Sequence, residues 1–352
     1  MEQAVPVYIL SGFLGSGKTT LLQKMLSAFR ADGKRPAVVM NELGDVNLDG
    51  QLIDARVPTA ELLGGCICCS IRGDLSLQLV ELVQQEAPDV IIIEATGAAN
   101  PLDILEGVSE TSLYVRLELR QLITVVDAAH LYDLYQEQRG KTYRLMQEQI
   151  RCASILLLNK TDRINGEDRD LLNGLLRQWN AYAPVLPAVQ CDVPIETLVN
   201  MDIAGVQREG QQDGHAGSIP HSGSHANACS HDHGEFCGCS DSSDGHEHAA
   251  HEPHDAHSHV MAYTHYFAGP VNSVEFEKLL QELPRDIYRA KGILTFHDTS
   301  GRFLFQYAYR ESDFMKIDPQ GEVQDVAVFI GEHFEKEEIK RRLSALVDSS
   351  VS

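Results

Sequence analysis

The chain has 352 residues, of which 43% are hydrophobic and 23% charged, proportions that are ordinary for a globular protein. Its formal net charge of −22 at pH 7 would repel phosphate backbones, which argues against nucleic acid as a partner. No apolar run is long enough to span a bilayer, so we expect no membrane partner, and the first residues lack the basic stretch of a secretory signal. We therefore expect a cytoplasmic protein whose eight cysteines stay reduced.

Residues 1–200 alternate short aliphatic runs with segments of helical periodicity. Val5–Leu10 predicts a buried strand that ends at a glycine-rich turn, and the apolar spacing up to Phe29 predicts the helix that follows. Leu75–Val83 has the same helical spacing. The alternation predicts an α/β fold with a mostly parallel sheet, covered on both faces, whose ligands bind at the carboxyl ends of the strands. The other expected strands of this sheet are Ala37–Met40, Val90–Ile93, Leu122–Val126, Ile155–Leu158 and Val185–Val189.

A glycine-rich stretch follows the first expected strand, where residues 12–19 read GFLGSGKT and fit the phosphate-binding pattern G-x-x-x-x-G-K-[ST]. The glycines let several backbone N–H groups point at one anion, and the helix start adds the positive end of its dipole. We expect Lys18 to reach the β- and γ-phosphates and the Thr19 hydroxyl to bind Mg²⁺. The predicted phosphate site consists of Gly12, Gly15, Ser16, Gly17, Lys18, Thr19 and Thr20.

The choice of base is indicated by Asn159, Lys160, Thr161 and Asp162, which follow a predicted strand and match the N-K-x-D element. The carboxylate of Asp162 can accept hydrogen bonds from the N1 and N2 donors of guanine. Adenine has no such pair of donors and would leave a desolvated carboxylate unpaired. Lys160 is expected to lie along the base and brace the phosphate loop. Together with the phosphate loop, this element favours GTP over ATP.

Two further segments carry acidic residues that chemistry at the γ-phosphate would need. Glu94 ends the predicted strand Val90–Ile93, where its carboxylate would lie near the Mg²⁺ of the nucleotide, and Gly97 lets the backbone approach the γ-phosphate. A polar loop follows the second strand, and we expect Glu42, Asp49 or the backbone near Gly97 to orient the attacking water. An ordinary strand end and an ordinary loop are the alternatives for these two segments.

Three cysteines crowd into the sequence GCICC, at Cys66, Cys68 and Cys69. They cannot all pair with one another, and a disulfide between adjacent cysteines is strained. Together they can bind one soft ion: their thiolates favour Zn²⁺ or Cu(I), with Co²⁺ and Ni²⁺ left open. A tetrahedral site would need a fourth ligand from Glu42, Asp45, water or a client protein, and such an incomplete shell favours handing the ion over. Buried free cysteines are the alternative.

The composition changes abruptly in the second half of the chain. Residues 215–259 hold 11 histidines, three cysteines and no Lys or Arg, and they are too poor in apolar residues to offset the entropy of ordering. We expect a disordered segment that is either a plain linker or a low-affinity metal reservoir for the cysteine site. The expected organisation is a P-loop GTPase domain at 1–200, a His/Cys-rich flexible linker at 201–262 and a small α+β domain at 263–350.

The elements expected in the last part follow from its periodicity. Two runs alternate like antiparallel strands around a turn at Asp298–Gly301, and two others have the spacing of amphipathic helices. The expected strands are Gly292–His297, Arg302–Tyr309 and Val326–Gly331, and the expected helices are Val274–Leu283 and Lys336–Leu346.

The motifs GFLGSGKTT, NELGD…NLD, GGCICC, EATG and NKTD occur in the order seen in the CobW family of metallochaperone GTPases, relatives of UreG and HypB. The chain resembles this family, which includes the zinc-regulated GTPase metalloprotein activators, over nearly its whole length, and GGCICC makes the resemblance specific. It implies GTP hydrolysis coupled to release of a metal from Cys66, Cys68 and Cys69 into a client metalloprotein. Two departures from the family pattern leave the fourth ligand open: the switch reads NELGD where the family often has NEFGE, and Met40 stands where some members are acidic.

Several alternatives remain beside the zinc chaperone. The same GTPase cycle would serve to deliver cobalt or nickel, and a regulatory GTPase would keep the cysteines for structure alone. A metal buffer with a vestigial nucleotide domain is a further alternative, against which the intact Lys18, Thr19 and Asp162 argue. Related GTPases often pair across the nucleotide, and by that analogy a nucleotide-dependent homodimer is also kept.

Overall fold

The computed structural model describes residues 3–42, 57–63, 70–137, 140–201, 260–299, 301–308, 310–319 and 323–348. Side chains are not described at 41–42, 61–63 and 70–73. The predictions for the side chain of Glu42, for Asp49, for Cys66, Cys68 and Cys69, and for the histidine-rich segment therefore lie outside the described residues. Among the helices that are described, none is long and apolar enough to cross a bilayer.

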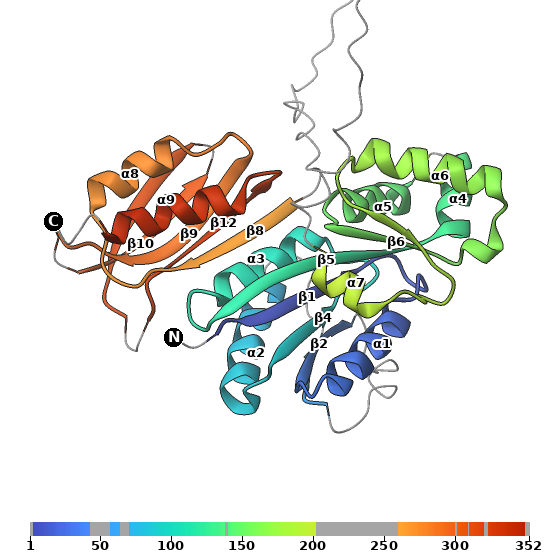
Figure 1. The fold of residues 1–352 in the computed structure, drawn as a ribbon, viewed down its shortest axis with the longest axis horizontal. Helices are drawn as coiled ribbons and strands as arrows, with labels where there is room; N and C mark the ends of the chain where they lie inside the picture. Colours follow the sequence, from blue (N-terminus) through green and yellow to red (C-terminus); the bar gives the residue numbers. More distant parts are fainter. Residues whose placement is uncertain are drawn as a thin grey trace, which may run out of the picture. The chain divides into compact units, whose positions relative to one another are not determined.

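Seven parallel strands form the first sheet, in the order β3-β2-β4-β1-β5-β6-β7. Figure 1 labels β2, β4, β1, β5 and β6 of this sheet. The expected parallel α/β architecture is thus confirmed, and each of the strands predicted for this part of the chain overlaps an observed one. The strand β3 was not predicted. The bounds are β1 Val5–Ser11, β2 Pro36–Glu42, β3 Thr59–Leu63, β4 Val90–Glu94, β5 Leu117–Asp127, β6 Ile155–Asn159 and β7 Val185–Pro187.

The central strands are apolar at nearly every position because helices cover both faces of the sheet. Along β1, Val7 and Ile9 join one buried cluster while Tyr8 and Leu10 join another, as the alternation of side chains in a strand requires. One cluster contains side chains of α1 and α7, and the other contains side chains of α2 to α6. The bounds are α1 Lys18–Ala31, α2 Ser70–Glu86, α3 Pro101–Thr111, α4 Ala128–Glu137, α5 Lys141–Arg151, α6 Gly166–Trp179 and α7 Ile195–Asn200.

Local signals in the sequence account for where several helices start and which face they bury. The helix α1 buries Leu21, Leu22, Met25, Leu26 and Phe29, the stripe expected from its spacing. At the start of α3, the Asn100 side chain accepts the N–H of Leu102 and a proline occupies the first turn. Asn165 caps α6 in the same way by accepting the N–H of Asp168.

The second sheet has five antiparallel strands in the order β11-β10-β9-β12-β8. Its core is rich in aromatic rings, with Phe276 of α8 making edge contacts to Phe305 and Phe314 at centroid distances of 4.9 and 6.4 Å. The small antiparallel domain confirms the expected α+β class. The bounds are β8 Val260–Tyr266, α8 Ser273–Gln281, β9 Ile287–Thr295, β10 Arg302–Ala308, β11 Glu311–Ile317, β12 Val326–Glu332 and α9 Lys336–Asp348.

The second sheet differs from the sequence-based prediction in three places. The strand predicted at Gly292–His297 begins earlier, at Ile287. Its first residues alternate buried and half-buried positions irregularly, so the period-two signal of a strand is weak there. Order was expected to resume near Tyr263, whereas β8 already begins at Val260. The edge strand β11, Glu311–Ile317, was not predicted at all.

Candidate nucleotide-binding site

The predicted motifs whose residues are described meet at the carboxyl edge of the first sheet. The phosphate loop follows β1, Glu94 ends β4, Asn159 ends β6, and the loop at Ala188 follows β7. The strand order places β4, β1, β5, β6 and β7 next to one another, so segments far apart in sequence line one edge of the sheet (Figure 1). This is the edge at which ligands of parallel sheets bind.

The phosphate loop is closed by contacts of its own lysine. Lys18 opens α1 and is 7% exposed, and its Nζ donates to the carbonyl oxygens of Gly12 at 2.9 Å and Phe13 at 3.2 Å. The ammonium group therefore lies over the concave side of the loop, where the anionic oxygens of a phosphate would compete for it. The loop begins at a glycine in the left-handed region, Gly12 with φ +133°, as the sharp turn requires.

Thr19 and Glu94 meet although 75 residues separate them in the chain. The Thr19 hydroxyl donates to Oε1 of Glu94 at 2.8 Å, and Glu94 is only 6% exposed. Mg²⁺ prefers oxygen ligands and commonly takes one or two protein oxygens beside those of the phosphates. A hydroxyl and a buried carboxylate side by side at the start of the phosphate-binding helix fit that requirement.

The loop that follows β4 packs directly on the phosphate loop. A Cβ at Gly97 would come within 2.6 Å of the backbone nitrogen of Leu14, so only glycine allows this approach. The side-chain amide of Gln149, which is buried on α5, donates to the carbonyl oxygens of Gly97 and Ala99 at 3.2 and 3.3 Å. Gln149 was not predicted as a site residue, because nothing in an amphipathic helix indicates which loop a buried amide will hold.

On the other side of the phosphate loop, Lys160 connects three elements. Its Nζ donates to the carbonyl oxygen of Gly15 at 2.7 Å and pairs with Oδ2 of Asp127 at 2.6 Å. Lys160 has a left-handed backbone, with φ +59°. Asp127 ends β5 and was missed by sequence analysis, although its position directly after a buried strand was a usable signal.

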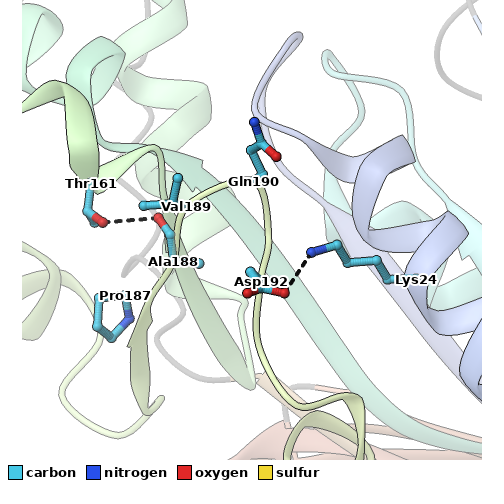
Figure 2. A pocket seen from close by; sticks show the side chains of 7 residues that line it. All are labelled: Lys24, Thr161, Pro187, Ala188, Val189, Gln190 and Asp192. Carbon is cyan, nitrogen blue, oxygen red and sulfur yellow. Dashed lines mark hydrogen bonds and ion pairs between the residues drawn. The ribbon is translucent and has the colours of Figure 1, made fainter.

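The base side of the site contains an open cavity of about 620 Å³. Thr161 lies on its wall, and its hydroxyl donates to the carbonyl oxygen of Ala188 at 3.1 Å (Figure 2). The N–H of Thr161 donates to the same oxygen at 3.2 Å. Lys24 of α1 pairs with Asp192 across the same cavity at 3.0 Å (Figure 2). Asp162 is exposed, in the short 3₁₀ turn η2, Thr161–Arg163, next to this wall.

The backbone register relates the last described residues before the two predicted segments that lie outside the described ranges. In the parallel pair of β2 and β3, Glu42 is opposite Leu63, the residue before GGCICC. In the pair of β2 and β4, Met40 is opposite Glu94. Within the described ranges, His, Cys, Asp and Glu side chains form no cluster of three that would hold a metal ion.

A glycine-rich loop between β1 and α1, a lysine folded over it and a buried carboxylate beside its threonine define a P-loop nucleotide-binding protein. Residues 6–187 match the family model for the CobW/HypB/UreG nucleotide-binding domain, which is more than half of the chain. The chain belongs to the CobW/HypB/UreG family. Residues 260–347 match the model for the cobalamin synthesis protein cobW C-terminal domain.

Among curated relatives, the chain is 29% identical over 248 residues to zinc-regulated GTPase metalloprotein activator 1 of Dictyostelium discoideum, covering 60% of this chain and 51% of the relative. It is 36% identical over 203 residues to the zinc chaperone YjiA of Escherichia coli, covering 56% of this chain and 61% of the relative. The chain thus spans between half and two thirds of the length of these two relatives. A crystal structure of the Zn(II)-bound YjiA GTPase matches 98% of this chain and 99% of its own, with 23% identity and a TM-score of 0.43.

Proposed function

We propose that this protein hydrolyses GTP and uses that cycle to bind zinc at Cys66, Cys68 and Cys69 and transfer it to a client metalloprotein in the cytoplasm. The observation that carries the proposal is the register of the sheet, in which the chain leaves β3 for GGCICC beside the end of β2. Neighbouring strands are about 4.8 Å apart, so β3 lies about 10 Å across the sheet from β4 and Glu94. This short separation supports energetic coupling between a metal bound after β3 and a nucleotide bound beside Glu94.

The described residues support the nucleotide half of this proposal. On binding, Lys18 would exchange the carbonyl oxygens of Gly12 and Phe13 for phosphate oxygens, while the backbone N–H groups of the loop surround the same anion. Thr19 and Glu94 would hold Mg²⁺, which when bound offsets negative charge on the phosphates. Asp162 would accept the two donors on the edge of guanine.

The metal half rests on the thiolates and on the names of the relatives, which are zinc chaperones and a zinc-regulated activator. In the proposed cycle, residues 41–49 respond to the γ-phosphate at one end and adjoin the cysteine segment at the other. Bound GTP would favour the zinc-holding arrangement, and hydrolysis would loosen the ion for a client whose own ligands complete its shell. Zinc is thus the cargo of the cycle.

We expect the full-length protein to lose its tightest zinc site when Cys66, Cys68 and Cys69 are all replaced by alanine, because the three thiolates supply most of the ligands of the ion. Zinc bound per chain is measured by equilibrium dialysis against a competing chelator that strips weaker sites. The matched control replaces Cys229, Cys237 and Cys239 by alanine and should keep the tight site. Unchanged tight zinc in the first variant would overturn the proposed metal site.

A further inference from the structure

A second cysteine-bearing segment lies on the base side of the nucleotide site, in the loop after β7. Cys191 is 0% exposed and has a left-handed backbone, with φ +53°. Its N–H donates to Oδ1 of Asn159 at 2.9 Å, and Nδ2 of the same Asn159 donates to the carbonyl oxygen of Ser16 at 2.8 Å. The amide of Asn159 therefore bridges the loop after β7 and the phosphate loop.

The thiol of Cys191 makes a second connection to the phosphate loop. Its Sγ donates to the carbonyl oxygen of Gly17 at 3.4 Å, within reach of a sulfur hydrogen bond. The same carbonyl accepts the N–H of Leu21 at 3.0 Å, where α1 begins. A Cβ at Gly17 would come within 3.0 Å of Sγ and 2.6 Å of Nδ2 of Asn159, so the three residues are closely packed.

The Cys191 thiol is in the protonated state that a hydrogen-bond donor needs. Burial raises the pKa of Cys191 to about 11, although the nearby Lys24 and Lys160 act to lower that pKa. At neutral pH the group is therefore an S–H, which can donate to the Gly17 carbonyl, whereas a thiolate would be repelled by it. The same protonation makes the sulfur a poor nucleophile and a poor metal ligand.

A left-handed backbone at a residue other than glycine is unfavourable and persists only where its surroundings hold it. At Cys191 those surroundings are Asn159 and Gly17, one from the guanine element and one from the phosphate loop. We propose that Cys191 is a positioning residue for nucleotide binding. Its N–H and S–H hold the loop after β7 and the phosphate loop in a fixed position relative to each other. This inference rests on the nucleotide site of the proposed function.

The first test replaces Cys191 by alanine and measures the dissociation constant for GDP with Mg²⁺ on the full-length protein. We expect affinity to fall about three- to tenfold, the range for one net hydrogen bond. Cys191→Ser keeps a donor and should recover part of the loss. The matched control is Cys152→Ala, which removes another fully buried thiol, at the end of α5, and should lower the unfolding temperature without changing GDP affinity. Wild-type affinity in Cys191→Ala would overturn the proposal.

The second test uses the wild-type protein and so does not depend on how the variants fold. The rates at which iodoacetamide alkylates Cys191 and Cys152 are measured by peptide mass spectrometry, with and without GDP and Mg²⁺. Ligand binding stabilises the whole fold and slows both reactions equally through global unfolding. Local positioning adds protection at Cys191 alone, so we expect a larger decrease there. Equal protection at both cysteines would contradict the inference, whereas failure of GDP to bind the wild type would contradict the nucleotide site itself.

Discussion

Replacing Lys18 by methionine is expected to lower the GTPase turnover by roughly 100-fold or more, because one preorganised cation at the transferring phosphate contributes on that scale. Methionine keeps much of the volume of the side chain but cannot donate to Gly12, Phe13 or a phosphate. Steady-state release of phosphate from GTP measures the effect. The unfolding temperature should change by only a few degrees, since the lost bonds lie within one loop.

The control for this variant is Lys34→Met, which removes an exposed lysine beyond the C-terminal end of α1 and next to the Phe29 ring, at the opposite end of the helix from the phosphate loop. It changes the net charge by the same amount and should leave turnover as it is. Turnover in Lys18→Met within threefold of the wild type would mean that this loop does not hold the reacting phosphate.

Glu94→Gln is expected to have the second large effect. The amide keeps the size of the side chain and can still accept the Thr19 hydroxyl, but it removes the buried negative charge that supports Mg²⁺. We expect turnover to fall roughly 100-fold at low Mg²⁺ and to recover partly when Mg²⁺ is raised. Phosphate release measured across a Mg²⁺ titration distinguishes weak metal binding from a loss that no metal concentration repairs.

Glu118→Gln is the matched control for this second variant. Glu118 lies near the start of β5, at the opposite end of the strand from the site, and pairs with Arg120 at the surface. Its loss should not alter the Mg²⁺ dependence. If Glu94→Gln showed the same Mg²⁺ dependence as the wild type, Glu94 would have no role at the metal.

The main features of the first sheet were predictable because burial on both faces makes its strands continuous aliphatic runs. The run Ile155–Asn159 is buried at all five positions, and Val90–Glu94 likewise. The strand β3 has the sequence TAELL, which lacks the continuous aliphatic run of the equally short β4 and β6, and its identity depends on pairing with β2. The edge strand β11 alternates exposed and half-buried positions and contains four charged or hydroxyl side chains in ESDFMKI, which resembles a loop in composition.

The residues of the candidate site also differ in whether the sequence alone reveals them. Residues that act through their own chemistry at fixed spacing, such as Lys18, Thr19 and Asp162, can be found from a motif. Residues that act through a partner cannot: Gln149 matters because it reaches Gly97, and Cys191 because it reaches Gly17. Those contacts arise only when α5 packs against the loop after β4 and the loop after β7 packs against the phosphate loop. The amino-acid type alone therefore gives no signal for them.

The central claim is that guanine nucleotide and zinc are energetically coupled within one chain. It is tested most directly by the zinc dissociation constant of the full-length protein, measured once with a non-hydrolysable GTP analogue and once with GDP, both with Mg²⁺. We predict that zinc binds about fivefold or more tightly in the GTP-like state, the lower end of typical coupling between sites, and that the difference vanishes when Cys66, Cys68 and Cys69 are alanine. Equal zinc affinity in the two nucleotide states of the wild type would contradict the account.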